Sequence, residues 1–149
     1  MPKIDPATAP SRKGSGYPAP HDQPVRERLR QRLGDAGGLS QFGVNRLTLA
    51  PGVWSSQRHW HSHEDEFVWV LEGEVVLVTD AGEEILRAGD CAAFPAGEAN
   101  GHRLVNRSPA PAVLLEVGSR DPLDHTIYSD IDMQCGVDGV FRNEAGKPL

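Results

Sequence analysis

The sequence is poor in features that point to a redox, secreted or membrane protein. Its 149 residues hold only two cysteines, Cys91 and Cys135, and neither belongs to a CxxC pair. We interpret both as reduced, buried side chains. The opening residues, MPKIDPATAP, lack the apolar core that a secretion signal needs, and no apolar run reaches the roughly 18 residues of a membrane span. We therefore expect a cytoplasmic protein with no membrane partner.

An excess of positive charge is also missing. The net charge is −6, and hydrophobic and charged residues make up 38% and 24% of the chain. Proteins that bind nucleic acid usually present a basic face, so we expect no nucleic-acid partner. An acidic average still permits a local basic pocket for a small anion. The length and composition fit one globular domain.

The N-terminal third divides into two segments. Residues 1–24 hold six of the 12 prolines, so we expect an extended or flexible arm. Residues 25–42 are interpreted as a short helix and its lead-in to the barrel. Val25, Leu29 and Leu33 would form one stripe, with Asp22 as the cap and Gly34 as the end. The helix would carry its arginines on a solvated face: Arg26, Arg28, Arg30 and Arg32.

From residue 43 onwards the pattern predicts strands. Short apolar runs alternate with turn residues, as in an all-β sandwich or barrel, and no helical period lies between them. We assign residues 43–120 to a barrel and 121–149 to a C-terminal extension that packs on it. The expected strands are 44–50, 67–73, 74–80, 83–89, 91–95, 102–106 and 112–118, followed by 128–134 and a hairpin over 137–147.

Two of these strands, 67–73 and 74–80, are apolar at nearly every position. Such strands are expected to be buried on both faces, which would include Phe67 and Trp69. One face would line the barrel. The other needs a second layer, supplied by the N-terminal arm or by another subunit, and we favour a homodimer.

The segment RHWHSHEDE, residues 58–66, places histidines at alternate positions. In a strand His59, His61 and His63 would project to one side. If the strand ends at His61, residues 62–65 form a four-residue hairpin loop and Glu66 lies opposite His61. A two-residue turn at 64–65 would instead pair His63 with Glu66, but Glu-Asp suits that turn poorly. We favour the longer loop.

Two interpretations of this cluster are open from the segment alone. Two imidazoles and a carboxylate suit a divalent transition metal such as Fe²⁺, Mn²⁺, Ni²⁺ or Zn²⁺. The segment could equally be a hydrated turn whose histidines bind nothing. His63 is interpreted as a loop residue, or as a residue that contacts a ligand without binding the metal itself.

The region from Gly52 to Asn106 resembles the two signature motifs of the cupin superfamily. In the first motif, Gly52 is followed by six residues, one more than the pattern has, and then by His59-Trp60-His61. Four residues lead to Glu66 and six more to Gly73. The spacing is otherwise that of the family.

In the second motif Gly89 is followed by DCAAF and by Pro95-Ala96-Gly97. Four residues then precede His102, where the strict pattern has two, so that Asn100 stands in the position of the histidine. Either the loop is longer and His102 remains a ligand, or the fourth ligand is lost. The three residues between His102 and Asn106 keep the family spacing, so we favour the longer loop.

The resemblance implies a small single-domain cupin: an all-β, double-stranded β-helix barrel. It implies one divalent metal held by His59, His61, Glu66 and His102. It also implies a metal-dependent enzyme of the dioxygenase, isomerase or lyase type, acting on a small, polar, oxygen-rich molecule. The alternative is a cupin that binds a sugar or acid without catalysis. The fold by itself does not choose between them.

Overall fold

The computed structural model describes residues 3–149, so Met1 and Pro2 of the expected arm lie outside the described residues. Two 3₁₀ turns, Pro6–Thr8 and Gln23–Val25, and one α-helix, α1 (Leu33–Ala36), accompany the strands. No helix within 3–149 is long and apolar enough to cross a membrane. The strands are β1 (Ser11–Lys13), β2 (Leu29–Arg32), β3 (Phe42–Leu49), β4 (His59–His61), β5 (Glu66–Glu72), β6 (Glu74–Thr79), β7 (Gly82–Arg87), β8 (Cys91–Phe94), β9 (Arg103–Val105), β10 (Ala112–Ser119), β11 (Thr126–Tyr128), β12 (Gln134–Cys135) and β13 (Phe141–Arg142).

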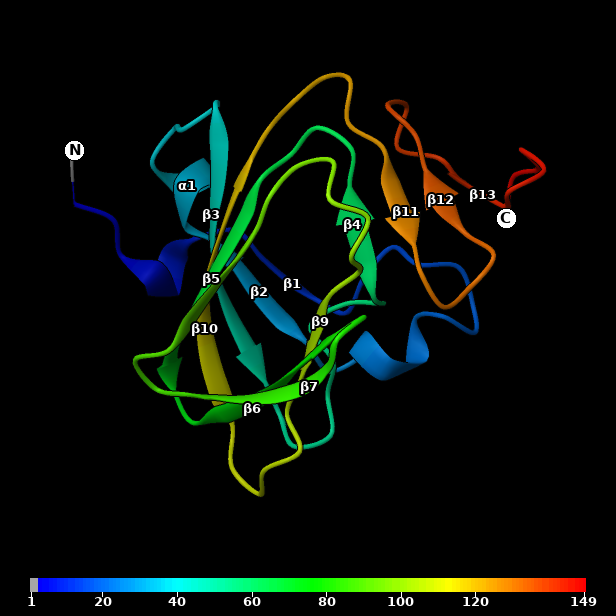
Figure 1. Ribbon diagram of the computed structural model, residues 1–149. Helices are drawn as coiled ribbons and strands as arrows, with labels where there is room; N and C mark the ends of the chain where they lie inside the picture. The colour runs from blue at the N-terminus through cyan, green and yellow to red at the C-terminus, as the bar shows by residue number, and fades with distance from the viewer. Residues whose placement is uncertain (1–2) are drawn as a thin grey trace.

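The strands form three antiparallel sheets that curve around one interior (Figure 1). Their orders are β1-β2-β3-β10-β5-β8, β13-β12-β11-β4 and β7-β6-β9. Two isolated bridges connect this part of the chain to the region of β9. Trp54, which precedes β4, pairs with Val105, and His59 on β4 pairs with His102. The predicted all-β barrel of the double-stranded β-helix type is therefore confirmed.

Inward-facing aliphatic residues fill one end of the barrel. On β5 burial alternates, with Val68 and Val70 buried and Trp69 and Leu71 exposed. Val70 is fully buried and belongs to a single cluster. The cluster is Leu47, Leu49, Val53, Val68, Val70, Val75, Leu77, Leu86, Leu104, Ala112 and Leu114. The polar part of the interior, with the histidines, therefore lies at the other end of the barrel.

The helix predicted for 25–33 is misplaced. Residues 29–32 form strand β2, which pairs along the edge of β3 from Leu29↔Thr48 to Arg32↔Asn45, and the α-helix begins only at Leu33. Asp22 makes no side-chain capping bond. A helix of this length is marginal by itself, whereas the open edge of β3 offers a ladder of backbone hydrogen bonds. Tertiary pairing therefore overrides the helical stripe.

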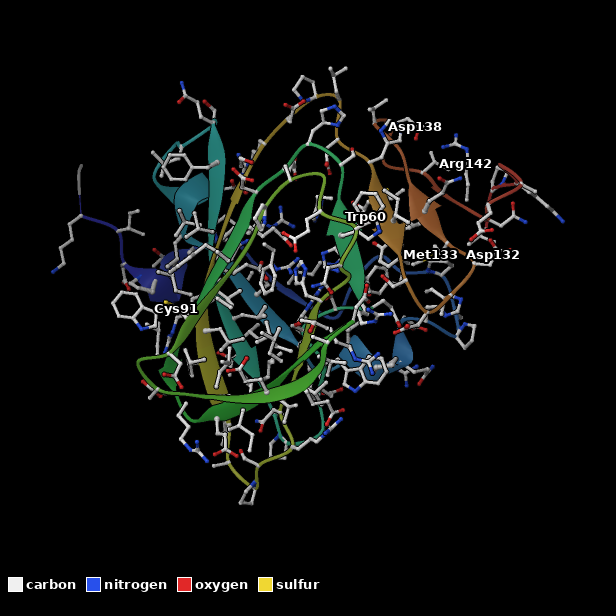
Figure 2. All side chains as sticks on the ribbon, in the orientation of Figure 1. Trp60, Cys91, Asp132, Met133, Asp138 and Arg142 are labelled. Atoms are coloured by element: carbon white, nitrogen blue, oxygen red, sulfur yellow. The ribbon has the colours of Figure 1, made fainter. Side chains whose placement is uncertain are left out.

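The outer face of β5 is not buried in the single chain. Trp69 is 45% exposed and Leu71 43%, so nothing within residues 3–149 covers the outer face of 67–73, and a second copy of the chain as its cover stays a prediction. Strand β6 is buried more completely, with Val75, Val76 and Leu77 all at 8% exposure or less. Cys91, expected to be buried, is exposed beside Trp69 in the β5–β8 pairing, at the edge of the molecule in Figure 2.

The connection between β4 and β5 also differs from the predicted hairpin. Strand β4 pairs with β11 of the C-terminal segment, with Thr126 opposite His61, and β5 pairs with β10 and β8. Residues 62–65 therefore cross from one sheet to another. The predicted strand 128–134 is likewise two strand ends, β11 and β12, joined by a turn. The turn at Asp138-Gly139 then leads from β12 to β13.

Candidate metal centre

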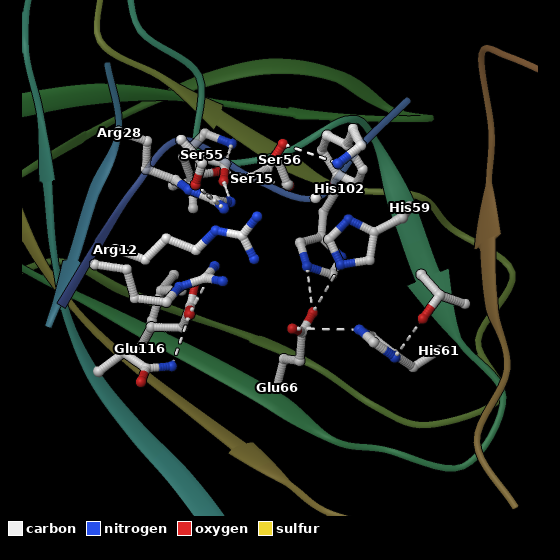
Figure 3. A pocket seen from close by; sticks show the side chains of 18 of the residues that line it. Arg12, Ser15, Arg28, Ser55, Ser56, His59, His61, Glu66, His102 and Glu116 are labelled. Carbon is white, nitrogen blue, oxygen red and sulfur yellow. Dashed lines mark hydrogen bonds and ion pairs between the residues drawn. The ribbon is translucent and has the colours of Figure 1, made fainter. Parts of the chain in front are cut away.

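Three separate segments bring the candidate ligands to one place inside the barrel (Figure 3). His59 and His61 lie on β4, where strand alternation turns both to the interior. Glu66 is the first residue of β5, and His102 immediately precedes β9. Although His61 and Glu66 are not cross-strand partners, the facing sheets bring their side chains together.

The Glu66 carboxylate is the meeting point of three imidazoles. Its Oε2 lies 2.7 Å from Nε2 of His102 and 3.5 Å from Nε2 of His59. Its Oε1 lies 3.3 Å from Nε2 of His61. His59, His61 and Glu66 form a group of ligand atoms that all lie within 4.8 Å of one another, close enough to hold a metal ion.

Hydrogen bonds at Nδ1, the ring nitrogen that points away from Glu66, orient the imidazoles of His59 and His61. Nδ1 of His59 lies 2.8 Å from the Gln57 carbonyl oxygen, and Nδ1 of His61 lies 2.7 Å from Oδ2 of Asp124. Because a carbonyl oxygen and a carboxylate accept hydrogen bonds, each Nδ1 carries the proton. In the neutral rings the lone pair is then on Nε2, which faces Glu66, as metal-binding histidines require.

The chemistry of this cluster fits a divalent cation. Glu66 Oε2 is buried and makes no hydrogen bond of acceptable geometry, despite its short distance to His102. A buried carboxylate oxygen without a donor is costly. Imidazole nitrogens and a carboxylate are ligands that Fe²⁺, Mn²⁺, Ni²⁺ and Zn²⁺ accept. A cation between them would satisfy the unpaired oxygen and the Nε2 lone pairs together.

His102 lies beside Glu66 despite the longer loop that precedes it. Its backbone exchanges two hydrogen bonds with His59, at 3.2 and 2.9 Å, and its ring stacks on Phe94 with 3.6 Å between centroids. Asn100, the residue at the family's histidine position, accepts a hydrogen bond from the Asp80 backbone instead. The two extra residues are therefore absorbed before His102, and its side chain stays in the barrel.

The charges in the cluster are strongly coupled. Burial by itself would raise the pKa of Glu66, but His102, His59 and His61 hold it well below its usual value. Burial opposes protonation of His61, yet Glu66 and Asp124 raise its pKa to about 9. Burial lowers the pKa of His102. Without a cation the cluster therefore keeps a proton on His61 at neutral pH.

Asp124 is a site residue that the sequence motifs do not indicate. It lies in the C-terminal segment just before β11 and accepts backbone hydrogen bonds from His63 and Glu64, besides facing His61. His61, Glu64 and Asp124 form a second group close enough to hold an ion. His63 is exposed, with Nδ1 2.8 Å from the Ser62 hydroxyl, and lies outside the cavity walls.

A cavity of about 480 Å³ opens from the cluster. This volume suits a small organic ligand. The candidate ligands form one part of its wall, and the N-terminal segment and β2 form another. Hydroxyl groups also line it, from Ser15, Tyr17, Ser55, Ser56, Thr126 and Tyr128. The lining is therefore suited to a ligand rich in oxygen.

Comparison with known proteins agrees with this architecture. The family model for the cupin domain matches residues 45–118. A cupin-superfamily sugar phosphate isomerase from Silicibacter pomeroyi DSS-3 has 51% sequence identity and a TM-score of 0.94, with 99% of this chain and 96% of that chain covered. The chain belongs to the cupin superfamily.

More distant proteins share the fold. A candidate sugar phosphate isomerase from Acidithiobacillus ferrooxidans is 30% identical, with a TM-score of 0.69 over 78% of this chain and 70% of that one. A polyketide cyclase from Streptomyces resistomycificus is 22% identical, with a TM-score of 0.64 over 81% and 80% of the two chains. A search of curated proteins gave no significant match. At 22% identity, the similarity to the polyketide cyclase concerns the fold alone.

Proposed function

We propose that this cupin is a metal-dependent isomerase that acts on a sugar phosphate. The observation that carries the proposal is the convergence of His59, His61 and His102 on buried Glu66 at the wall of a polar cavity. Of the reaction types open to a cupin, isomerisation is favoured by the 51% identical relative, whose name describes a sugar phosphate isomerase.

The four side chains have a common task in this proposal. His59, His61, Glu66 and His102 would hold one divalent cation, with Asp124 and the Gln57 carbonyl fixing the rings of His61 and His59. The cation would polarise the carbonyl and the neighbouring hydroxyl of the sugar. The reaction moves a proton from C2 to C1 and another from the C2 hydroxyl to the C1 oxygen, so no oxidant is needed.

The chain's own contribution is to bind and shield the sugar. Hydroxyl groups of Ser56, Thr126 and Tyr128 line the cavity and can exchange hydrogen bonds with the sugar hydroxyls. The Phe94 ring, stacked on His102, limits the movement of that imidazole. Fixed ligands and walls keep the reacting carbons in one orientation relative to the cation.

Turnover of aldose and ketose phosphates by the Fe²⁺, Mn²⁺, Ni²⁺ and Zn²⁺ forms tests the proposal. Proton NMR in deuterium oxide would follow both product formation and exchange at C2. We expect isomerisation with at least one metal and none with His61→Ala. Tight binding of sugar phosphates with neither turnover nor exchange in any metal form would contradict catalysis and favour a binding protein.

We also propose a homodimer, because the outer face of the β5 side of the barrel carries Trp69 and Leu71 at 45% and 43% exposure. A second copy of the chain would cover this face. Light scattering at micromolar concentration should give the mass of two chains, and Trp69→Glu should reduce it to one. A single-chain mass for the unmodified protein would refute the dimer.

A further inference from the structure

The cavity beside the histidines is basic, although the whole chain carries a net charge of −6. Five arginines and three carboxylates line it, one of which is Glu66. The arginines are Arg12, Arg28, Arg30, Arg32 and Arg120. Figure 3 shows Arg12 and Arg28 on one side of the cavity, with His59, His61 and Glu66 on the other.

The strand conformation of residues 29–32 explains this cluster. In a helix the arginines would spread around the axis, but from residue 28 into β2 alternate positions share one face. Arg30 pairs with Leu47, which is fully buried, so this face is the interior one. Strand β1 adds Arg12 directly opposite Arg30. The solvated arginine face expected from the sequence is therefore wrong for Arg28 and Arg30.

Arg28 has a structural task in this wall. It is 4% exposed, and its two terminal nitrogens donate to the carbonyl oxygens of Ser55 and Gly14. Burial lowers its pKa to about 10, with Arg30 contributing. Gly14 has φ +82°, a conformation that favours glycine, and the turn there leads Ser15 and Tyr17 into the cavity wall. Arg28 therefore fixes the segment that carries Arg12.

Arg12 and Arg30 retain hydrogen-bonding capacity. Arg30 forms one ion pair, 3.2 Å from Glu116, while its buried Nε–H has no acceptor. Among residues 3–149, Arg12 has no ion-pair or hydrogen-bond partner for its guanidinium. Two like charges placed opposite each other on paired strands destabilise a sheet. An anion between them would remove that repulsion.

The geometry points to an anion subsite in which Arg12 and Arg30 bind the phosphate group of the substrate. Guanidinium groups present paired N–H donors that match a phosphate, and a dianion gains from two of them. Arg12 is exposed, so the subsite is open to an entering ligand. With the sugar end at the histidine cluster, the cavity would hold both ends of one molecule. The identity of that molecule rests on the proposed function, whereas the anion subsite does not.

The test uses phosphate binding to protein freed of metal by a chelator, so that phosphate cannot bind a cation at Glu66. Isothermal titration with inorganic phosphate should show binding by the unmodified protein. We expect Arg12→Gln and Arg30→Gln each to weaken it at least 10-fold, and Arg30→Lys to weaken it less than Arg30→Gln. Unchanged phosphate affinity in Arg12→Gln, whose guanidinium makes no hydrogen bond or ion pair within residues 3–149, would overturn the subsite.

Arg26→Gln is the matched control, because Arg26 is a neighbouring exposed arginine outside the cavity wall. It should leave phosphate affinity unchanged, and an equal loss would refute a specific subsite. Acetate replaces phosphate in a second arm. Acetate that binds as tightly as phosphate, and weakens equally in Arg12→Gln, would overturn the assignment to a phosphate group.

Failure of the subsite and failure of the proposed isomerase can be distinguished. Phosphate binding that depends on Arg12, without turnover of any sugar phosphate, supports the subsite and contradicts the isomerase. Turnover with the same KM for sugar phosphates in Arg12→Gln supports the isomerase and overturns the subsite. If both hold, Arg12→Gln should raise KM for the phosphorylated sugar at least 10-fold while metal content stays unchanged.

Discussion

The barrel region and the segments that flank it contribute differently to the same cavity. The barrel, matched over 45–118, supplies His59, His61, Glu66 and His102. The flanking segments supply the cationic wall from β1 and β2, and Asp124 beside β11. The barrel carries the candidate ligands for a cation. The flanking segments carry the arginines that we propose as donors for an anion, together with the Asp124 carboxylate, which faces His61.

This division shows how a common barrel can acquire a particular ligand. The candidate ligands of the barrel alone are compatible with many reactions, because the fold does not determine the chemistry. The flanking wall adds charge of one sign at a fixed place, through pairing of β2 with β3 and of β11 with β4. If the proposed function holds, substrate choice would depend on segments outside the motif-bearing region.

The largest expected effect comes from the barrel side of this comparison. His61→Ala removes an imidazole that faces both Glu66 and Asp124, so we expect metal affinity to fall more than about 100-fold. Elemental analysis of protein purified without a histidine tag should drop from about one ion per chain to nearly none. His63→Ala should keep its metal. Loss of metal in the His63 variant instead would contradict this ligand set.

A second prediction for the barrel concerns the stability of the fold and not the metal cluster. Asn106 is fully buried, and its Nδ2 donates to the carbonyl oxygens of Leu49 and Ala110, each at 2.8 Å. Asn106→Ala leaves both carbonyls without their donor and should lower the free energy of unfolding by about 2–4 kcal/mol, measured in urea.

Asn100→Ala is the comparison for that change, since Asn100 accepts one hydrogen bond near the surface. It should cost less than about 1 kcal/mol and leave the metal in place. Loss of metal from the Asn100 variant would show that the family's histidine position, rather than His102, supplies a ligand.

The flanking side should give a smaller effect on metal binding. In Asp124→Asn the side-chain oxygen can still accept from the backbones of His63 and Glu64. Its amide would then donate toward His61 Nδ1 and favour a proton on Nε2, the nitrogen that faces Glu66. We expect metal affinity to fall about 10- to 100-fold in a competition titration.

Asp121→Asn provides the control, because Asp121 lies in the same segment and accepts from the Leu123 backbone. It should leave metal affinity unchanged. Equal affinities for the Asp124 and Asp121 variants would contradict an orienting role for Asp124.

The two regions also differ in how far the sequence predicts them. Strand alternation indicates the barrel and the inward direction of His59 and His61, because short-range periodicity determines which side chains face inward. The motif spacing adds Glu66, although the hairpin expected to place it opposite His61 does not form. Placing His102 in the site needs one further inference. The loop before it must be longer by two residues, so that the spacing from His102 to Asn106 is kept. The bridge between His59 and His102 is the contact that holds it there.

The sequence predicts the flanking residues poorly, because their structure depends on distant partners. Val25, Leu29 and Leu33 fit a helical stripe, yet β2 forms on the edge of β3, and this reverses the interpretation of the arginines. Asp124 has no motif, and its role arises only when β11 pairs with β4. In the barrel, by contrast, Trp69 on β5 is exposed in the single chain, and a second copy that covers it stays a prediction.

The central claim is that a cation held by the barrel and a phosphate held by the flanking arginines occupy one cavity. Relaxation of the ³¹P nucleus of a bound sugar phosphate in the Mn²⁺-loaded protein measures their proximity directly. We predict a strong paramagnetic enhancement of the ³¹P relaxation rate. It should disappear in His61→Ala, because that variant does not hold the ion. It should also disappear when Arg12→Gln and Arg30→Gln are combined, because that variant lacks the donors for the phosphate. Enhancement of full strength in the double arginine variant would contradict the account.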